Sequence, residues 1–139
     1  MSETILVPFD GSKYSNKAVR EAVSISKRSG AKLVILSVVD ITDEFETQAP
    51  GLADKLSKKT RILLDKIADK ITAANISVVK EVHIGDPYEI IVTLAKKIKA
   101  DLIVMGSHGR TGISRLLMGS VAARVIGHAP CNVLVVKSA

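Results

Sequence analysis

Residues 5–38 read ILVPFDGSKYSNKAVREAVSISKRSGAKLVILSV, and this stretch contains a complete strand–helix–strand pattern. The run Ile5–Val7 is apolar, contains β-branched residues and stops at Pro8, which predicts a short buried strand. After a turn, apolar residues recur at helical spacing to about Arg28 and predict an amphipathic helix. Leu33–Val38 is a second apolar run and predicts the next strand. Because a helix joins the two strands, we expect them to pair in parallel.

The rest of the chain repeats this alternation of strand and helix. Beyond residue 38 we expect an acidic loop at 40–51, a helix at 52–74, a strand at 78–84, a helix at 87–99, a strand at 102–105, a helix at 119–127 and a strand at 132–137. Asp86 and Pro87 suit the N-cap and the first turn of their helix. The longest helix has an apolar stripe, which we assign to Leu56, Leu63, Ile67 and Ile71.

Strands that alternate with helices indicate an α/β protein. Helical crossovers cover both faces of a parallel sheet, which agrees with the nearly continuous apolar strands. We therefore expect a doubly wound, five-stranded parallel sheet with helices on both faces. Alternation does not determine the strand order, and among the orders known for such sheets we expect 3-2-1-4-5. The length of 139 residues fits a single domain that covers residues 1–139.

The composition narrows the class of protein. Hydrophobic residues make up 47% and charged residues 24% of the chain, as in globular proteins. Aromatic residues, at 3%, are few for a base-stacking platform. The net charge of +6 is not gathered in one basic block, so we favour a solvated surface over a nucleic-acid interface. With one cysteine, no signal peptide and no membrane-length apolar run, a cytoplasmic protein is expected.

Glycines gather directly after the strand expected at 102–105. Ligands of open parallel sheets bind at the carboxyl ends of the strands, which is where Gly106, Gly109 and Gly112 lie. The segment then reaches Gly119–Ser120 at a helix start, where unpaired N–H groups and the helix dipole attract phosphate. The P-loop and the dinucleotide fingerprint are both absent from the sequence. The segment therefore predicts a site for a phosphorylated ligand of a different type.

The spacing Gly106-x2-Gly109-x9-Gly119-Ser120 resembles the nucleotide motif of the universal stress proteins, specifically of their ATP-binding branch. Two further segments resemble the same family. ILVPFDGSKYSNKAV at 5–19 is similar to its opening strand, turn and helix, and HAPCNVLVVK at 128–137 is similar to its closing strand. The resemblance covers the whole chain and is weakest at 40–52. It implies an adenine nucleotide alpha hydrolase-like fold and a nucleotide-binding regulatory protein.

The resemblance also implies a set of ligand contacts in the glycine-rich loop 106–112 and the helix start 119–121. Adenine and ribose are expected at Pro8 and Asp10, and the main chain at Val38 is expected to read the adenine edge. Met105 and Gly106 are expected to flank the ribose. The expected phosphate contacts are Gly109, Arg110, Gly112, Gly119, Ser120 and Val121.

The ligand that the resemblance implies is ATP, with Mg²⁺ or Mn²⁺ bridging phosphate oxygens and no dedicated protein metal site. The resemblance further implies a homodimer through strand 132–137, since a terminal edge strand leaves backbone groups for a second copy. A downstream protein partner is expected, and the sequence does not identify it. Membrane and nucleic-acid partners are not expected.

Several of these residues also suit roles without a ligand. Asp10 fits the turn before the first helix, Ser12 its N-cap, and Ser120 the N-cap of a later helix. We interpret His108 as a ligand contact or a bystander rather than a general base. Two other functions stay open: an enzyme of nucleotide hydrolysis or adenylyl transfer that uses Asp10, Ser12 or His108, and a basic RNA- or DNA-binding module. No residue evident in the sequence activates water, so at most weak ATP hydrolysis is expected.

Overall fold

The computed structural model describes residues 3–40, 49–109 and 118–137. Its elements are β1 (Thr4–Pro8), α1 (Lys13–Ser29), β2 (Lys32–Val39), α3 (Leu52–Ala73), β3 (Val78–Ile84), α4 (Pro87–Lys97), β4 (Leu102–Gly106), α5 (Ser120–His128) and β5 (Asn132–Val136). Most of the loop expected at 40–51 falls outside the described residues, as do Arg110 and Gly112.

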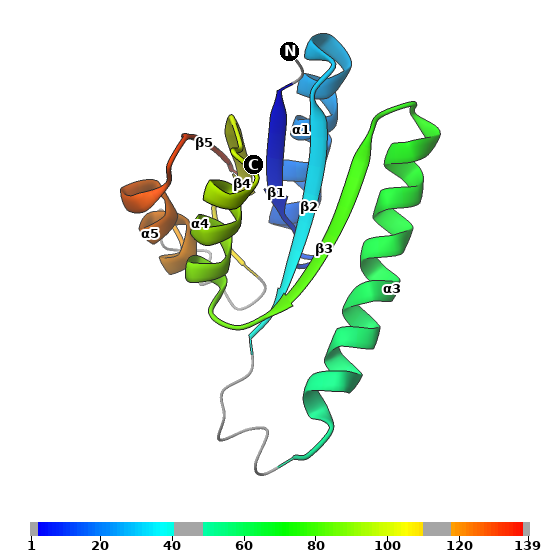
Figure 1. Cartoon of the computed structure of the whole chain (residues 1–139), viewed down its shortest axis with the longest axis vertical. Coiled ribbons are helices and arrows are strands. Elements are labelled where there is room, and N and C mark those ends of the chain that lie inside the picture. Colours follow the sequence, from blue (N-terminus) through cyan, green and yellow to red (C-terminus); the bar gives the residue numbers. More distant parts are fainter. Residues whose placement is uncertain (1–2, 41–48, 110–117, 138–139) are drawn as a thin grey trace.

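The strands form one parallel sheet in the order β3-β2-β1-β4-β5, which confirms the predicted order. β1 pairs with β2 over its whole length, from Thr4 opposite Lys32 to Pro8 opposite Leu36. On its other side β1 pairs with β4, so the chain reverses its direction of travel across the sheet at this strand. Helices α1 and α3 cover one face of the sheet, and α4 and α5 cover the other (Figure 1).

The core lies on both sides of the sheet because successive side chains of a strand point to opposite faces. Ile5 and Val7 of β1 pack into the cluster under α1 and α3, whereas Leu6 packs into the cluster under α4 and α5. All three side chains are fully buried, as a strand covered on both faces requires. Within the described residues, no helix combines the length and apolar character needed to cross a membrane.

Helix caps hold α1 and α4 where the sequence predicts them. The Ser12 side chain accepts a hydrogen bond from the Ser15 N–H at 3.2 Å, which confirms Ser12 as the N-cap of α1. The Asp86 carboxylate accepts one from the Glu89 N–H at 3.0 Å and caps α4, with Pro87 in the first turn. Both caps follow strands, so they bring two helix N-termini to the carboxyl edge of the sheet.

The apolar stripe of α3 differs from the prediction at one position. Leu64 is 1% exposed and packs against the sheet, whereas Leu63 is 43% exposed. Ile71 is buried as predicted, and Leu56 and Ile67 are half-buried. Leu63 and Leu64 are adjacent, so both fit a helical period and only the rotation of the helix against the sheet distinguishes them. That rotation places Leu63 beside the turn at Gly11, with its Cδ1 3.7 Å from where a Cβ would lie.

Helix α4 also ends earlier than predicted, at Lys97 instead of residue 99. Ile98 is its C-cap, and Lys99 has a positive φ of 53°, which an α-helix does not accommodate. This ending leads the chain directly into Ala100, which is buried two residues before β4 begins.

Candidate functional site

A cleft of about 550 Å³ opens at the carboxyl ends of β1, β2 and β4. This is the edge at which open parallel sheets bind ligands, at the point where strand order reverses. All predicted site residues within the described ranges line the cleft: Pro8, Asp10, Val38, Met105, Gly106, Gly109, Gly119, Ser120 and Val121. The remaining two, Arg110 and Gly112, lie outside those ranges.

Asp10 takes part in the turn before α1 and also reaches the cleft. Its Oδ1 accepts a hydrogen bond from the Ser12 N–H at 2.9 Å, and its own N–H donates to Ser15 Oγ at 3.3 Å. A Cβ added at Gly109 would lie 3.2 Å from Asp10 Oδ2, so this oxygen faces the glycine-rich segment. The two interpretations from the sequence, turn residue and cleft residue, are therefore compatible.

The main chain of Val38 points into the cleft because β2 is longer than β1. The Phe9 N–H donates to the Leu36 carbonyl at 2.8 Å, so Leu36 presents its backbone groups toward β1. Two residues later Val38 presents its groups in the same direction, beyond the end of β1. No hydrogen bond from another described residue engages them. A donor and an acceptor thus stand side by side at the cleft wall.

Gly119 closes the segment that begins at Ser107. Its N–H donates to the Ser107 carbonyl at 2.7 Å. A Cβ at Gly119 would lie 3.1 Å from that carbonyl oxygen and 3.2 Å from the His108 Cα, both in the backbone. This N–H is therefore used inside the protein, and Gly119 contributes close approach rather than a free donor.

Helix α5 begins at the cleft without a side-chain cap. Gly119 is its N-cap and Ser120 is the first helical residue, so the interpretation of Ser120 as the cap is wrong. Among the described residues, the N–H groups of Ser120, Val121 and Ala122 have no hydrogen-bond acceptor. These groups carry the positive end of the helix dipole and suit an anionic ligand.

Ser107, His108 and Tyr14 form a cluster beside this helix start. Ser107 Oγ and His108 Nδ1 are 2.9 Å apart, and the rings of Tyr14 and His108 have centroids 5.0 Å apart. Ser107 is buried, at 2% exposure, and lines the cleft together with His108. His108 was expected from the sequence as a ligand contact or a bystander, whereas Ser107 was missed although it lies between Gly106 and His108.

Asp40, Pro87 and Ile91 also line the cleft and were missed as site residues. Asp40 follows the end of β2, and Pro87 and Ile91 come from the start of α4. The signal was the Asp86–Pro87 helix start directly after β3, since the end of β3 lies on the same edge as the glycine-rich segment. Pro87 and Ile91 add apolar surface to the lining of the cleft.

Within the part of the chain that the structure describes, the carboxylates of the cleft do not belong to any group of three possible metal ligands. Within residues 3–40, 49–109 and 118–137, no three His, Cys, Asp or Glu side chains are grouped closely enough to hold a metal ion. The described residues lining the cleft include the carboxylates of Asp10 and Asp40. Such a donor set suits a cation that is held mainly by a bound ligand's phosphates, as Mg²⁺ often is.

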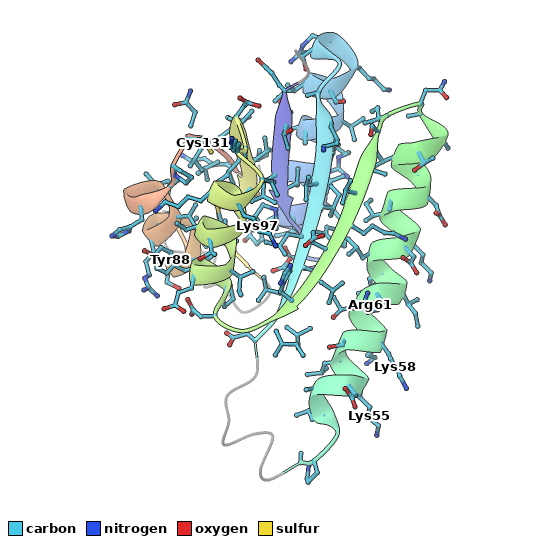
Figure 2. The ribbon with its side chains drawn as sticks, in the orientation of Figure 1. Lys55, Lys58, Arg61, Tyr88, Lys97 and Cys131 are labelled. Atoms are coloured by element: carbon cyan, nitrogen blue, oxygen red, sulfur yellow. The ribbon has the colours of Figure 1, made fainter. Side chains whose placement is uncertain are left out.

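The basic side chains of α3 lie away from this cleft. Lys55, Lys58 and Arg61 project from α3, which covers the face of the sheet opposite to α4 and α5 (Figure 2). They are exposed, and α3 contributes no residue to the lining of the cleft. Cys131 precedes β5 and therefore lies at the other end of the sheet (Figure 2).

Comparison with known proteins assigns the chain to a family. The model of the Universal stress protein family matches residues 1–137. Universal stress protein MJ0531 of Methanocaldococcus jannaschii is 39% identical over 137 residues, which span 96% of this chain and 81% of that protein.

Solved structures agree with this match. Universal stress protein UspA from Lactobacillus plantarum superposes with a TM-score of 0.87 at 31% identity, covering 96% of this chain and 97% of that one. A universal stress protein crystallised in complex with cAMP superposes with a TM-score of 0.73 at 32% identity, covering 99% and 98%. The family model and the superposed structures each cover nearly the whole chain, and the glycine spacing at 106–120 agrees with them. The chain therefore belongs to the universal stress protein family.

Proposed function

We propose that the cleft binds ATP together with Mg²⁺ or Mn²⁺, and that the protein acts in the cytoplasm as a nucleotide-dependent regulator. The observation that carries this proposal is the start of α5, where the N–H groups of Ser120, Val121 and Ala122 have no acceptor among the described residues and border a cleft of about 550 Å³. A phosphate group satisfies such N–H groups and the helix dipole together. The cAMP complex of a 32% identical relative supports an adenine nucleotide as the ligand class.

The rest of the cleft suits the base and the ribose. The N–H and carbonyl of Val38 can pair with the edge of a base, between the apolar side chains of Met105 and Ile91. Asp10 also lines the cleft, and its Oδ2 faces Gly109, which supports a role for this carboxylate in holding the ribose hydroxyls. In this arrangement the nucleotide extends from β2 across β1 and β4 to α5.

The cation would be held by phosphate oxygens and water, with Asp10 as a described carboxylate that lines the cleft and faces Gly109. Its chemistry when bound is to offset the charge of the phosphates. We propose binding with at most weak hydrolysis. Of the carboxylates that line the cleft within the described residues, Asp10 is held by the Ser12 N–H and Asp40 is exposed after β2.

The regulatory unit in this proposal is a homodimer joined through strand 132–137. The Ser107 N–H donates to the Val136 carbonyl at 3.0 Å, so Val136 faces β4. Val133 and Val135 then present their backbone groups to the open edge of the sheet. Leu134, at 37% exposure, adds apolar surface at this edge. A second copy of β5 can pair there, and nucleotide occupancy would alter the binding of a downstream protein.

Titration calorimetry with ATP and Mg²⁺ tests the binding proposal, alongside mass spectrometry of small molecules released from the denatured protein. We expect micromolar binding or a co-purified adenine nucleotide. Gly109→Val should abolish binding because its side chain would enter the space beside Asp10 Oδ2. Gly127→Ala is the matched control, since no described residue lies within 4 Å of the added Cβ and Gly127 does not line the cleft. An empty wild-type protein that refuses ATP would refute the proposal.

A further inference from the structure

We propose that His108 donates a hydrogen bond to a phosphate of the bound ligand, and that Ser107 and Tyr14 are positioning residues that hold its ring for this role. The inference rests on the proposed function and deepens it. It adds a side chain that distinguishes phosphorylated ligands from the bare nucleoside.

The ring of His108 is held by two neighbours from different elements. Ser107 Oγ lies 2.9 Å from His108 Nδ1. The Tyr14 ring, on the first turn of α1, packs against the imidazole at a centroid distance of 5.0 Å and an angle of 43° between the planes. Tyr14 is itself held against β4, because its backbone occupies the space that a Cβ at Gly106 would need. The imidazole therefore has little freedom to turn.

Ser107 is a firm anchor for this arrangement. Its side chain is 2% exposed, its N–H donates to the Val136 carbonyl at 3.0 Å, and its carbonyl accepts from the Gly119 N–H at 2.7 Å. These bonds connect Ser107 to β5 and to the N-cap of α5. The hydroxyl thus keeps a fixed position relative to the helix start where the phosphate is proposed to lie.

The hydrogen bond at Nδ1 determines what the other ring nitrogen offers. When the Ser107 hydroxyl donates to Nδ1, the neutral ring carries its proton on Nε2, which is then a donor. The opposite tautomer would direct an Nε2 lone pair toward the phosphate oxygens, and the repulsion between lone pairs would disfavour it. A hydroxyl can serve as donor or acceptor, so Ser107 permits the tautomer that an anionic ligand selects.

The ring carbon bonded to Nε2 lies toward Gly119, the N-cap of α5. A Cβ added at Gly119 would lie 3.8 Å from the His108 Cδ2, the carbon bonded to Nε2. The Nδ1 edge faces Ser107 instead. Nε2 therefore lies on the side of the N–H groups at the start of α5, and His108 itself lines the cleft. A donor at this place contacts a phosphate and not the base.

The test compares two amide substitutions of His108 by calorimetry, each titrated with ATP and Mg²⁺ and separately with adenosine. His108→Gln places an amide donor near the position of Nε2, whereas His108→Asn reaches only the position of Nδ1. A hydrogen bond to a charged group predicts that His108→Asn weakens ATP binding by about 10- to 100-fold. We expect His108→Gln to stay within about 3-fold of wild type, and adenosine to bind all three proteins equally.

Ser107→Ala, made in the wild type and in the His108→Gln variant, tests the positioning role. We expect it to weaken ATP binding in the wild type by about 3- to 10-fold and to have little further effect in the His108→Gln background. His108 is partly exposed, so the His108 pair still decides the proposal if Ser107→Ala does not fold. If the His108→Asn and His108→Gln variants bound ATP equally, or if a variant lost affinity for ATP and adenosine to the same extent, this inference would be overturned and the proposed function would stand. A wild-type protein that binds neither ligand would overturn the proposed function and this inference together.

Discussion

Replacing Gly106 by alanine should destabilise the protein by crowding the contact between β4 and the first turn of α1. The added Cβ would lie 2.7 Å from the Tyr14 Cβ and 2.8 Å from its carbonyl carbon, closer than the 3.0 Å that real Cβ contacts respect. The crowded atoms belong to the Tyr14 backbone or are bonded directly to it. Relief therefore requires a shift of α1 itself and not a change of rotamer.

Overpacking of a fitted core costs about 1–3 kcal/mol, and a backbone contact places Gly106→Ala in the upper part of that range, at about 2–3 kcal/mol. For a chain of 139 residues this lowers Tm by roughly 6–12 °C. Urea unfolding, followed by circular dichroism and extrapolated linearly, measures the free energy of unfolding.

Gly127→Ala is the control for the intrinsic effect of replacing glycine. No atom of residues 3–40, 49–109 or 118–137 lies within 4 Å of its added Cβ, so the substitution should leave stability unchanged or raise it by up to about 1 kcal/mol. If the Gly106→Ala variant were as stable as the wild type, the reasoning would be contradicted, because the close contact between Tyr14 of α1 and Gly106 of β4 could not then exist as described.

Four further results are expected. Gly109→Val should lose ATP binding by calorimetry yet unfold in urea near the wild-type midpoint, since the nearest atom to its Cβ is a side-chain oxygen. Val135→Pro should convert a dimer to a monomer in light scattering without disturbing the β4 ladder, because the N–H it removes faces the open edge. Burial raises the pKa of the Cys131 thiol, so less thiolate is present at a given pH, and alkylation at pH values of about 8–9 should be slower in the folded protein than in urea. Asp65→Asn should leave the urea midpoint unchanged: Asp65 and Lys80, although 2.7 Å apart, are both exposed, and exposed ion pairs stabilise little.

The sequence predicted the sheet well because its signals are local and mutually consistent. The run Ile5–Val7 is buried on both faces, and the caps at Ser12 and Asp86 lie where their residue types suggest. The burial of Leu64 instead of Leu63 could not be predicted, since it depends on how α3 rotates against the sheet. Periodicity specifies that one side of a helix is apolar, and tertiary packing selects the boundary of that side.

The candidate site was predicted in outline for a similar reason. Glycine spacing and strand ends suffice to bring Gly109 and Ser120 into one cleft. The contribution of Pro87 and Ile91 to the cleft could not be predicted, because it depends on where α4 crosses the sheet and residue spacing does not show this. The pairing of Ser107 with His108 depends on rotamers and was equally inaccessible.

The glycines of the motif have different physical roles, which the spacing alone conceals. Gly119 donates its N–H to the Ser107 carbonyl, and a Cβ at this position would be crowded against the backbone of Ser107 and His108. Gly119 therefore joins the two ends of the segment as well as leaving space for a ligand. Gly109 is exposed, and among the described residues a Cβ built there meets only the Asp10 carboxylate. A substitution at Gly119 therefore alters fold and binding together, and its loss of binding would not identify a ligand site. Gly109 separates the two effects, which makes it the informative position for deciding whether the cleft binds a nucleotide.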